Sequence, residues 1–213
     1  MKVPKPVKSR RGRPSLAQAS AIDKMILEVA QDLFLGSGFD QVSMEQIVAA
    51  AGVSKGTLYA RYSSKEALFG AVIMAAIRRW SAEAAREDDL LTDDIAQRLR
   101  HHARTIQRFA HRQDVLAMQR LVMACSGRFP KLAATMHDRG YRYIVGLIAR
   151  DITEAEKAEG RVPRDAEGVA HMLYASLTGI HMEPLAADGN SEATPTIAAD
   201  RVVDVLIAAR STW

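Results

Sequence analysis

The chain has 213 residues, so it can hold one full domain or a small domain joined to a larger one. Hydrophobic residues make up 48% of it, which is ample for a buried core, and a single cysteine, Cys125, excludes an intrachain disulfide. Since no long uncharged apolar stretch and no signal-peptide pattern occur, the sequence predicts a soluble, cytoplasmic protein without a membrane partner.

The net charge of +4 is concentrated at the N-terminus. Residues 1–13 hold six basic and no acidic residues, whereas the rest of the chain holds 23 basic and 25 acidic residues. With three prolines in its first 14 residues, segment 1–19 is predicted to be a flexible basic arm. We expect Arg10, Arg11 and Arg13 to follow the minor groove of DNA, where the negative potential favours arginine. A solubilising tail is the alternative.

Residues 42–62 predict two short helices joined by a tight turn. Ser43 and Gln46 have the spacing of a capping box at the start of the first helix. Gly52 suits the left-handed residue that ends this helix, and Ser54 can cap the next one. Two helices with a short glycine-containing turn make a helix-turn-helix, whose second helix reads the major groove of DNA.

The residues around this unit follow a specific order and spacing. The pattern consists of residues 26–34, 38–39, 42–44, 47–59, 62 and 64–68. It resembles the DNA-binding domain of the TetR family of transcriptional regulators, which we expect over residues 20–66. Ala60 and Arg61 stand where the family often carries an aromatic residue and a histidine, so the resemblance implies DNA binding but leaves the operator preference open.

The second short helix carries the side chains that we expect to enter the major groove of double-stranded DNA. These are Lys55, Thr57 and Tyr59, and Arg61 could read guanine because arginine bonds bidentately to that base. Gly56 would let the backbone approach closely. The whole expected DNA-binding set is Arg10, Arg11, Arg13, Ser43, Ser54, Lys55, Gly56, Thr57, Tyr59, Arg61, Tyr62 and Lys65.

Ser43, Lys65 and the Tyr59 hydroxyl are the candidates for phosphate contacts. Lys65 lies in the first turn of a predicted helix, where the helix dipole disfavours a cation. An external anion such as a DNA phosphate would explain this placement, and a solvated surface lysine is the alternative.

The rest of the chain shows helical periodicity and no alternating strand pattern. Helices are expected at about 64–86, 92–110, 114–125, 130–158, 166–182 and 196–210. The sequence therefore predicts an all-α protein, with an N-terminal helix-turn-helix domain and a larger helical ligand-binding and dimerisation domain over residues 67–213.

The TetR resemblance implies a pocket for an unknown small-molecule effector, walled by helices between about residues 90 and 180. Segment 119–162 is also similar to the C-terminal domain of AefR-like repressors. Six apolar or aromatic side chains could line such a pocket, with an ordinary core role as the alternative for each. They are Met118, Met123, Phe129, Met136, Tyr141 and Met172.

The same resemblance implies a two-fold homodimer joined by a four-helix bundle from the last two long helices. Core packing within one chain is the alternative for the apolar residues on these helices. The candidate interface consists of Val169, Leu173, Leu177, Ile180, Val202, Val205 and Leu206.

No catalytic motif, cofactor fingerprint or metal-ligand spacing is found, so we expect no enzyme, no cofactor and no metal. We predict a dimeric repressor that a small-molecule ligand releases from a palindromic operator. The alternatives are an activator with the same DNA-binding unit, or a helical ligand-binding adaptor without specific DNA binding.

Overall fold

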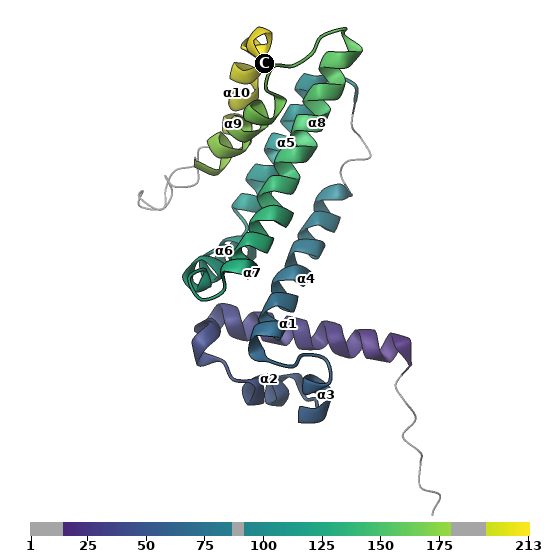
Figure 1. The fold of residues 1–213 in the computed structure, drawn as a ribbon, viewed down its shortest axis with the longest axis vertical. Helices are drawn as coiled ribbons and strands as arrows, with labels where there is room; N and C mark the ends of the chain where they lie inside the picture. Colours follow the sequence, from purple (N-terminus) through teal and green to yellow (C-terminus); the bar gives the residue numbers. More distant parts are fainter. Residues whose placement is uncertain (1–14, 87–91, 180–194) are drawn as a thin grey trace, which may run out of the picture. The chain divides into compact units, whose positions relative to one another are not determined.

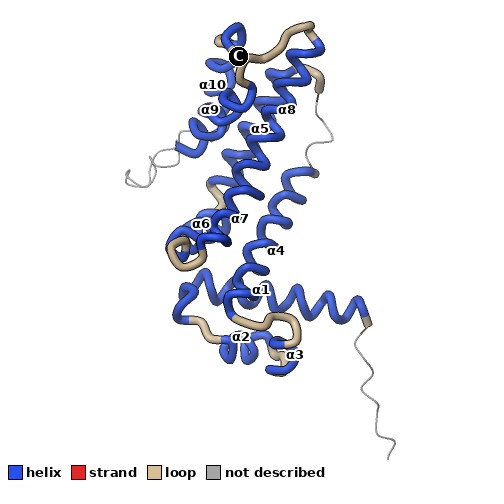
Figure 2. Tube along the Cα trace, viewed as in Figure 1, coloured by secondary structure: helices blue, strands red, loops and turns tan. Residues whose placement is uncertain are grey.

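The computed structural model of the chain describes residues 15–86, 92–179 and 195–213. Within these ranges the regular structure is helical and contains no strand, which confirms the predicted all-α fold (Figure 2). The chain divides into two compact units, the first ending at Val72 and the second beginning at Ile73. None of the described helices is long and apolar enough to cross a membrane.

The first unit begins with α1 (Leu16–Gln41), four residues before the predicted start of the DNA-binding domain. Ser15 and Gln18 cap this helix reciprocally, with Gln18 N donating to Ser15 Oγ at 3.2 Å and Ser15 N donating to Gln18 Oε1 at 3.0 Å. Residues 16–19 are therefore helical and are not part of the arm. Gly38 interrupts the helix with φ of 78°, a conformation that glycine adopts without a Cβ clash.

Three further helices complete the first unit: α2 (Met44–Ala51), α3 (Lys55–Tyr59) and the first turns of α4 (Lys65–Ala85) (Figure 1). Its core contains three phenylalanines. The Phe34 ring centroid lies 5.7 Å from that of Phe39 and 5.2 Å from that of Phe69. Burial of these large rings contributes hydrophobic free energy and fixes α1 against α4.

The second unit contains the remaining helices. They are α5 (Ile95–Ala110), α6 (Gln113–Cys125), α7 (Pro130–His137), the π-helical turn η2 (Asp138–Arg142), α8 (Tyr143–Ala158), α9 (Ala166–Gly179), α10 (Pro195–Ala208) and the 3₁₀ turn η4 (Arg210–Thr212). The single helix predicted over residues 130–158 is thus divided by the π turn. Gly140 lies within that turn, where its low helix propensity favours an irregularity.

The core of the second unit is shared by α5, α8, α9 and α10, which pack along one another (Figure 1). Leu99, Ile148, Leu173 and Val203, one from each helix, are fully buried in one hydrophobic cluster. Because each helix contributes an apolar face to this cluster, the four helices stabilise one another.

A buried carboxylate ties α8 to α5 within this core. Asp151 is 5% exposed and lies 2.8 Å from His102 Nε2 and 3.3 Å from Arg98 Nη1. Burial alone would raise the pKa of Asp151, but the hydrogen bond with His102 and the charges of His102 and Arg98 lower it below its ordinary value. Asp151 is therefore held as a paired carboxylate.

Candidate nucleic-acid interface

The structure confirms the predicted helix starts and turn of the helix-turn-helix. Gln46 N donates to Ser43 Oγ at 3.2 Å, and Thr57 N donates to Ser54 Oγ at 3.0 Å. Gly52 ends α2 in the left-handed conformation, with φ of 61°. These local bonds fix the direction in which the short helix α3 leaves the turn.

The outer face of α3 presents a small group of residues to solvent. Lys55, Gly56 and Tyr59 are exposed, whereas Leu58 on the inner face is fully buried. The Lys55 ammonium lies 5.6 Å from the centroid of the Tyr59 ring. Thr57 is half-buried, and its hydroxyl lies 2.8 Å from that of Ser54. The face therefore combines a cation, an aromatic ring and a glycine that permits close approach of another molecule.

Lys55 forms an ion pair across the turn. Its Nζ lies 2.8 Å from Oε1 of Glu45, which is in the first turn of α2, and both side chains are mostly exposed. Their hydrogen bond lowers the pKa of Glu45 and raises the pKa of Lys55. Both groups are therefore charged at neutral pH.

Arg61 and Tyr62 turn towards α1. The Tyr62 hydroxyl donates to Asp23 Oδ1 at 2.8 Å, and Arg61 Nε lies 3.7 Å from the same oxygen. Arg61 Nη1 also donates to the Thr57 carbonyl oxygen at 3.2 Å. A DNA contact by Arg61 or Tyr62 stays a prediction, and it would compete with the Asp23 carboxylate. Asp23 could not be identified from a local pattern, because it lies 39 residues before Tyr62.

Lys65 has partners inside the protein. Its Nζ donates to the carbonyl oxygens of Phe39 and Val42, both at 2.8 Å, and approaches that of Asp40 at 3.4 Å. The ammonium also lies 4.4 Å from the centroid of the Phe39 ring. Three acceptors match the three hydrogens of an ammonium, so Lys65 stabilises the end of α1. The predicted phosphate contact stays a prediction.

The six candidate ligand residues differ in their exposure to solvent. Met118 is fully buried, Met123 and Met172 are 75% and 54% exposed, and Phe129, Met136 and Tyr141 are half-buried. The Tyr141 hydroxyl is hydrogen-bonded to Nδ1 of His171, and its ring packs edge-on against Tyr174 at 4.8 Å. Any role for these residues in ligand binding stays a prediction.

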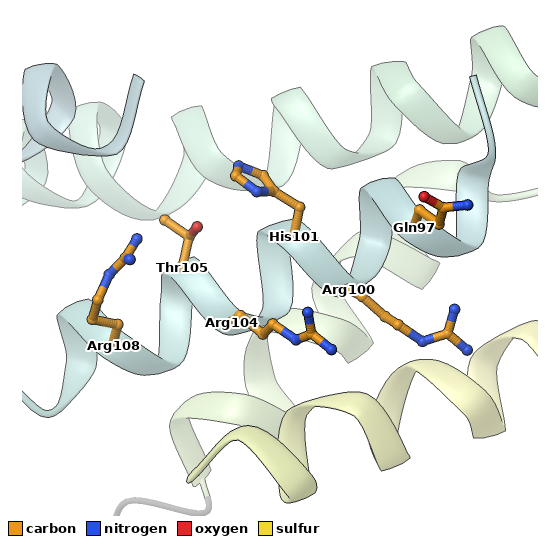
Figure 3. Close-up of a pocket in the computed structure, with 6 residues that line it drawn as sticks. All are labelled: Gln97, Arg100, His101, Arg104, Thr105 and Arg108. Atoms are coloured by element: carbon orange, nitrogen blue, oxygen red, sulfur yellow. The ribbon is translucent and has the colours of Figure 1, made fainter. Parts of the chain in front are cut away.

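A surface cavity of about 440 Å³ lies elsewhere, along one face of α5. Its lining consists of Gln97, Arg100, His101, Arg104, Thr105 and Arg108 (Figure 3). Arg100 and Arg104 point towards α10, where they pair with Asp204 and Asp200, in each case with a shortest N···O distance of 2.6 Å. None of the six candidate ligand residues lines this cavity. Arg100, Arg104 and Arg108 recur every four residues in the sequence. This spacing places them on one face of a helix, so it could have indicated the basic lining of this cavity.

The candidate dimer residues separate into two sets. Val169, Leu173 and Leu177 are at most 4% exposed and belong to the core of their own chain, so the structure corrects their placement on a surface. Val202 and Leu206 pack against that core, whereas Val205 is 63% exposed. Ile180 lies outside the described residues, as do Arg10, Arg11 and Arg13 of the expected DNA-binding set.

A short capped helix that follows a glycine turn and presents an exposed polar face defines the class of helix-turn-helix DNA-binding proteins. Comparison with known families agrees with this class. Residues 26–72 match the family described as "Bacterial regulatory proteins, tetR family". Residues 97–209 match the "AefR-like transcriptional repressor, C-terminal domain". The chain belongs to the TetR family of bacterial regulatory proteins and is a DNA-binding transcriptional regulator.

Similar proteins extend along most of the chain. The "Uncharacterized HTH-type transcriptional regulator YdeS" of Bacillus subtilis (strain 168) is 30% identical, over 79% of this chain and 80% of its own length. The regulator UidR of Escherichia coli (strain K12) is 28% identical, over 78% and 84% of the two chains. Among solved structures, the "Flavonoid-responsive Regulator FrrA" is 26% identical, with a TM-score of 0.73 over 90% of this chain and 95% of its own.

Proposed function

We propose that the protein is a homodimeric repressor that binds a palindromic operator and is released by a small-molecule effector. The observation that carries this proposal is the exposed face of α3, where Lys55, Gly56 and Tyr59 project from a helix fixed by its caps. A regulator that binds chromosomal DNA acts in the bacterial cytoplasm. The sequence-specific part of binding is assigned to this face and its neighbour Thr57.

The dimer is supported by apolar side chains left exposed on the last two helices. Met172 of α9 and Val205 of α10 are 54% and 63% exposed, and both helices pack against each other. A second copy would cover these side chains in a four-helix bundle. One reading helix contacts few bases, so a two-fold dimer is the economical way to recognise two half-sites of an operator.

The electrostatic part of binding is assigned to the basic arm. Residues 15–72 hold six acidic and four basic residues, whereas residues 1–13 hold six basic and no acidic residues. Phosphate neutralisation supplies much of protein–DNA affinity. We therefore infer that Arg10, Arg11 and Arg13 contact the DNA backbone or minor groove beside the helix-turn-helix.

The effector is assigned to the second unit, which matches the C-terminal domain of AefR-like repressors. The similarity of the chain to the Flavonoid-responsive Regulator FrrA supports a response to a small molecule. An effector that binds one dimer conformation more tightly than the other shifts the population towards it. The released state would be the conformation in which the two α3 helices no longer match the operator half-sites.

Transcription in vitro separates repression from activation. A template would carry a promoter next to the operator, obtained by selection from random DNA. Repression predicts that added protein lowers the transcript in proportion to operator occupancy. A transcript that rises with occupancy would show an activator, and an unchanged transcript with no operator binding would support the adaptor alternative.

A further inference from the structure

Between residues 15 and 72 the first unit holds more acidic than basic residues, although we assign DNA binding to it. Between residues 15 and 72 there are four basic side chains, and each has an acceptor within the protein. Lys24 lies 3.7 Å from Glu28, and Arg61 lies 3.7 Å from Asp23. Lys65 is bound by backbone carbonyl oxygens, and Lys55 is bound by Glu45. Each cation of the described part of this unit is therefore held by an acceptor of the protein itself, and three of the four acceptors are carboxylates.

The Lys55–Glu45 pair differs from the other three in its position. Lys55 is the first residue of α3 and Glu45 lies in the first turn of α2, so the pair bridges the two helices of the helix-turn-helix. Lys55 belongs to the exposed face that we assign to the major groove, where a free ammonium would attract any DNA sequence. A carboxylate at 2.8 Å occupies the ammonium as a phosphate oxygen would.

We propose that Glu45 is a specificity-determining residue, which binds the Lys55 ammonium and withholds it from non-operator DNA. On such DNA the pair stays closed, and Lys55 adds nothing to affinity. If the pair opened there, an uncompensated carboxylate would be left close to the phosphates. On the operator, a DNA acceptor that lies within reach of Lys55 replaces Glu45 as the partner of the ammonium. The contacts of the neighbouring α3 residues with the operator compensate for the loss of the Lys55–Glu45 pair. Exposed ion pairs are weak, so this exchange is accessible.

This inference rests on the operator-specific binding proposed above, and its test uses the full-length chain. Affinity would be measured against the selected operator and against a short duplex of scrambled sequence, over a range of salt concentrations. Glu45→Gln keeps the shape of the side chain and removes its charge. If Lys55 then gains one phosphate, the non-operator salt slope steepens by about 0.9. If the variant and the wild type bind non-operator DNA equally at 1 M salt, this difference in slope makes the variant bind roughly eightfold more tightly at 0.1 M salt.

Lys55→Met is the second variant, and it gives an independent result if Glu45→Gln folds poorly. The proposal predicts that Lys55→Met weakens operator binding but does not flatten the non-operator salt slope, because Lys55 contacts no phosphate there. The Glu45 carboxylate that it leaves unpaired should lower non-operator affinity by repulsion alone. In the double variant, the steepening of the non-operator salt slope by Glu45→Gln should disappear, because the cation that it releases is gone.

Glu28→Gln is the matched control, since it removes the same charge from an ion pair within α1. It should change non-operator affinity less than Glu45→Gln does. The proposal is overturned if Glu45→Gln leaves the non-operator salt slope unchanged or changes non-operator affinity no more than the control does. It is likewise overturned if Glu45→Gln steepens the slope equally in the Lys55→Met background, which would indicate simple charge repulsion. It is also overturned if Lys55→Met alone flattens the non-operator salt slope. A wild-type protein without operator preference would instead refute the proposed function.

Discussion

Replacing Lys65 with methionine separates a positioning role from a phosphate contact. The ammonium donates to the Phe39 and Val42 carbonyl oxygens at 2.8 Å and packs on the Phe39 ring. Each hydrogen bond from a charged donor contributes about 1.5–3 kcal/mol, and Lys65 is only partly shielded from solvent. Methionine retains most of the apolar volume but no donor. We therefore expect Lys65→Met to cost about 2–3 kcal/mol of the stability of the first unit.

Native-state hydrogen exchange would report this cost locally, through the amides of α1 and α2. Lys55→Met is the control, because it removes an exposed lysine whose solvent-screened ion pair contributes little to stability. Unchanged exchange rates in Lys65→Met would refute the positioning role. If the salt slope of DNA binding also fell by about one unit, the phosphate contact inferred from the sequence would be supported instead.

Three further predictions concern the second unit. Asp151→Asn should cost about 3 kcal/mol at neutral pH, because it removes the buried carboxylate that pairs with Arg98 and His102. The pKa of Asp151 is lowered in the folded state, so its stabilisation is present above the ordinary value of 3.8 and is lost as the pH falls through the folded value. In urea denaturation, the free energy of unfolding of this variant should therefore fall less than that of the wild type as the pH is lowered. Val205→Glu should dissociate the dimer in sedimentation experiments, since it places a charge within the proposed apolar interface. A variant that remains dimeric would exclude Val205 from that interface. Gln107 is 2% exposed and its buried Nε2 has no hydrogen-bond partner, so Gln107→Met should raise the unfolding free energy by about 1 kcal/mol, and a loss of stability would contradict this reading.

Features that depend on residues close in the sequence were predictable. The Ser43 cap and the turn at Gly52 follow from residues at most four apart, and both are present in the structure. The same capping-box spacing occurs at Ser15 and Gln18, which would have given the true start of α1. Local rules therefore suffice for the outline of the helix-turn-helix.

Pairings between distant residues were not predictable from one sequence. Lys65 reaches carbonyl oxygens more than 20 residues earlier, so a dipole argument about its own helix misses them. Helical periodicity likewise marks an apolar face without saying what covers it. Leu173 and Val205 have the same type of apolar pattern, but one is buried in its own chain and the other is exposed. Only packing in three dimensions distinguishes the two.

Selection from a pool of random duplexes would show whether the protein is a dimeric, sequence-specific regulator. The full chain would be incubated with the pool at near-physiological salt, and the retained DNA would be sequenced. A dimeric, sequence-specific regulator predicts an enriched palindrome whose half-sites lie about one helical turn, or a multiple of it, apart. Weak retention without sequence preference, lost steeply as salt rises, would contradict that account.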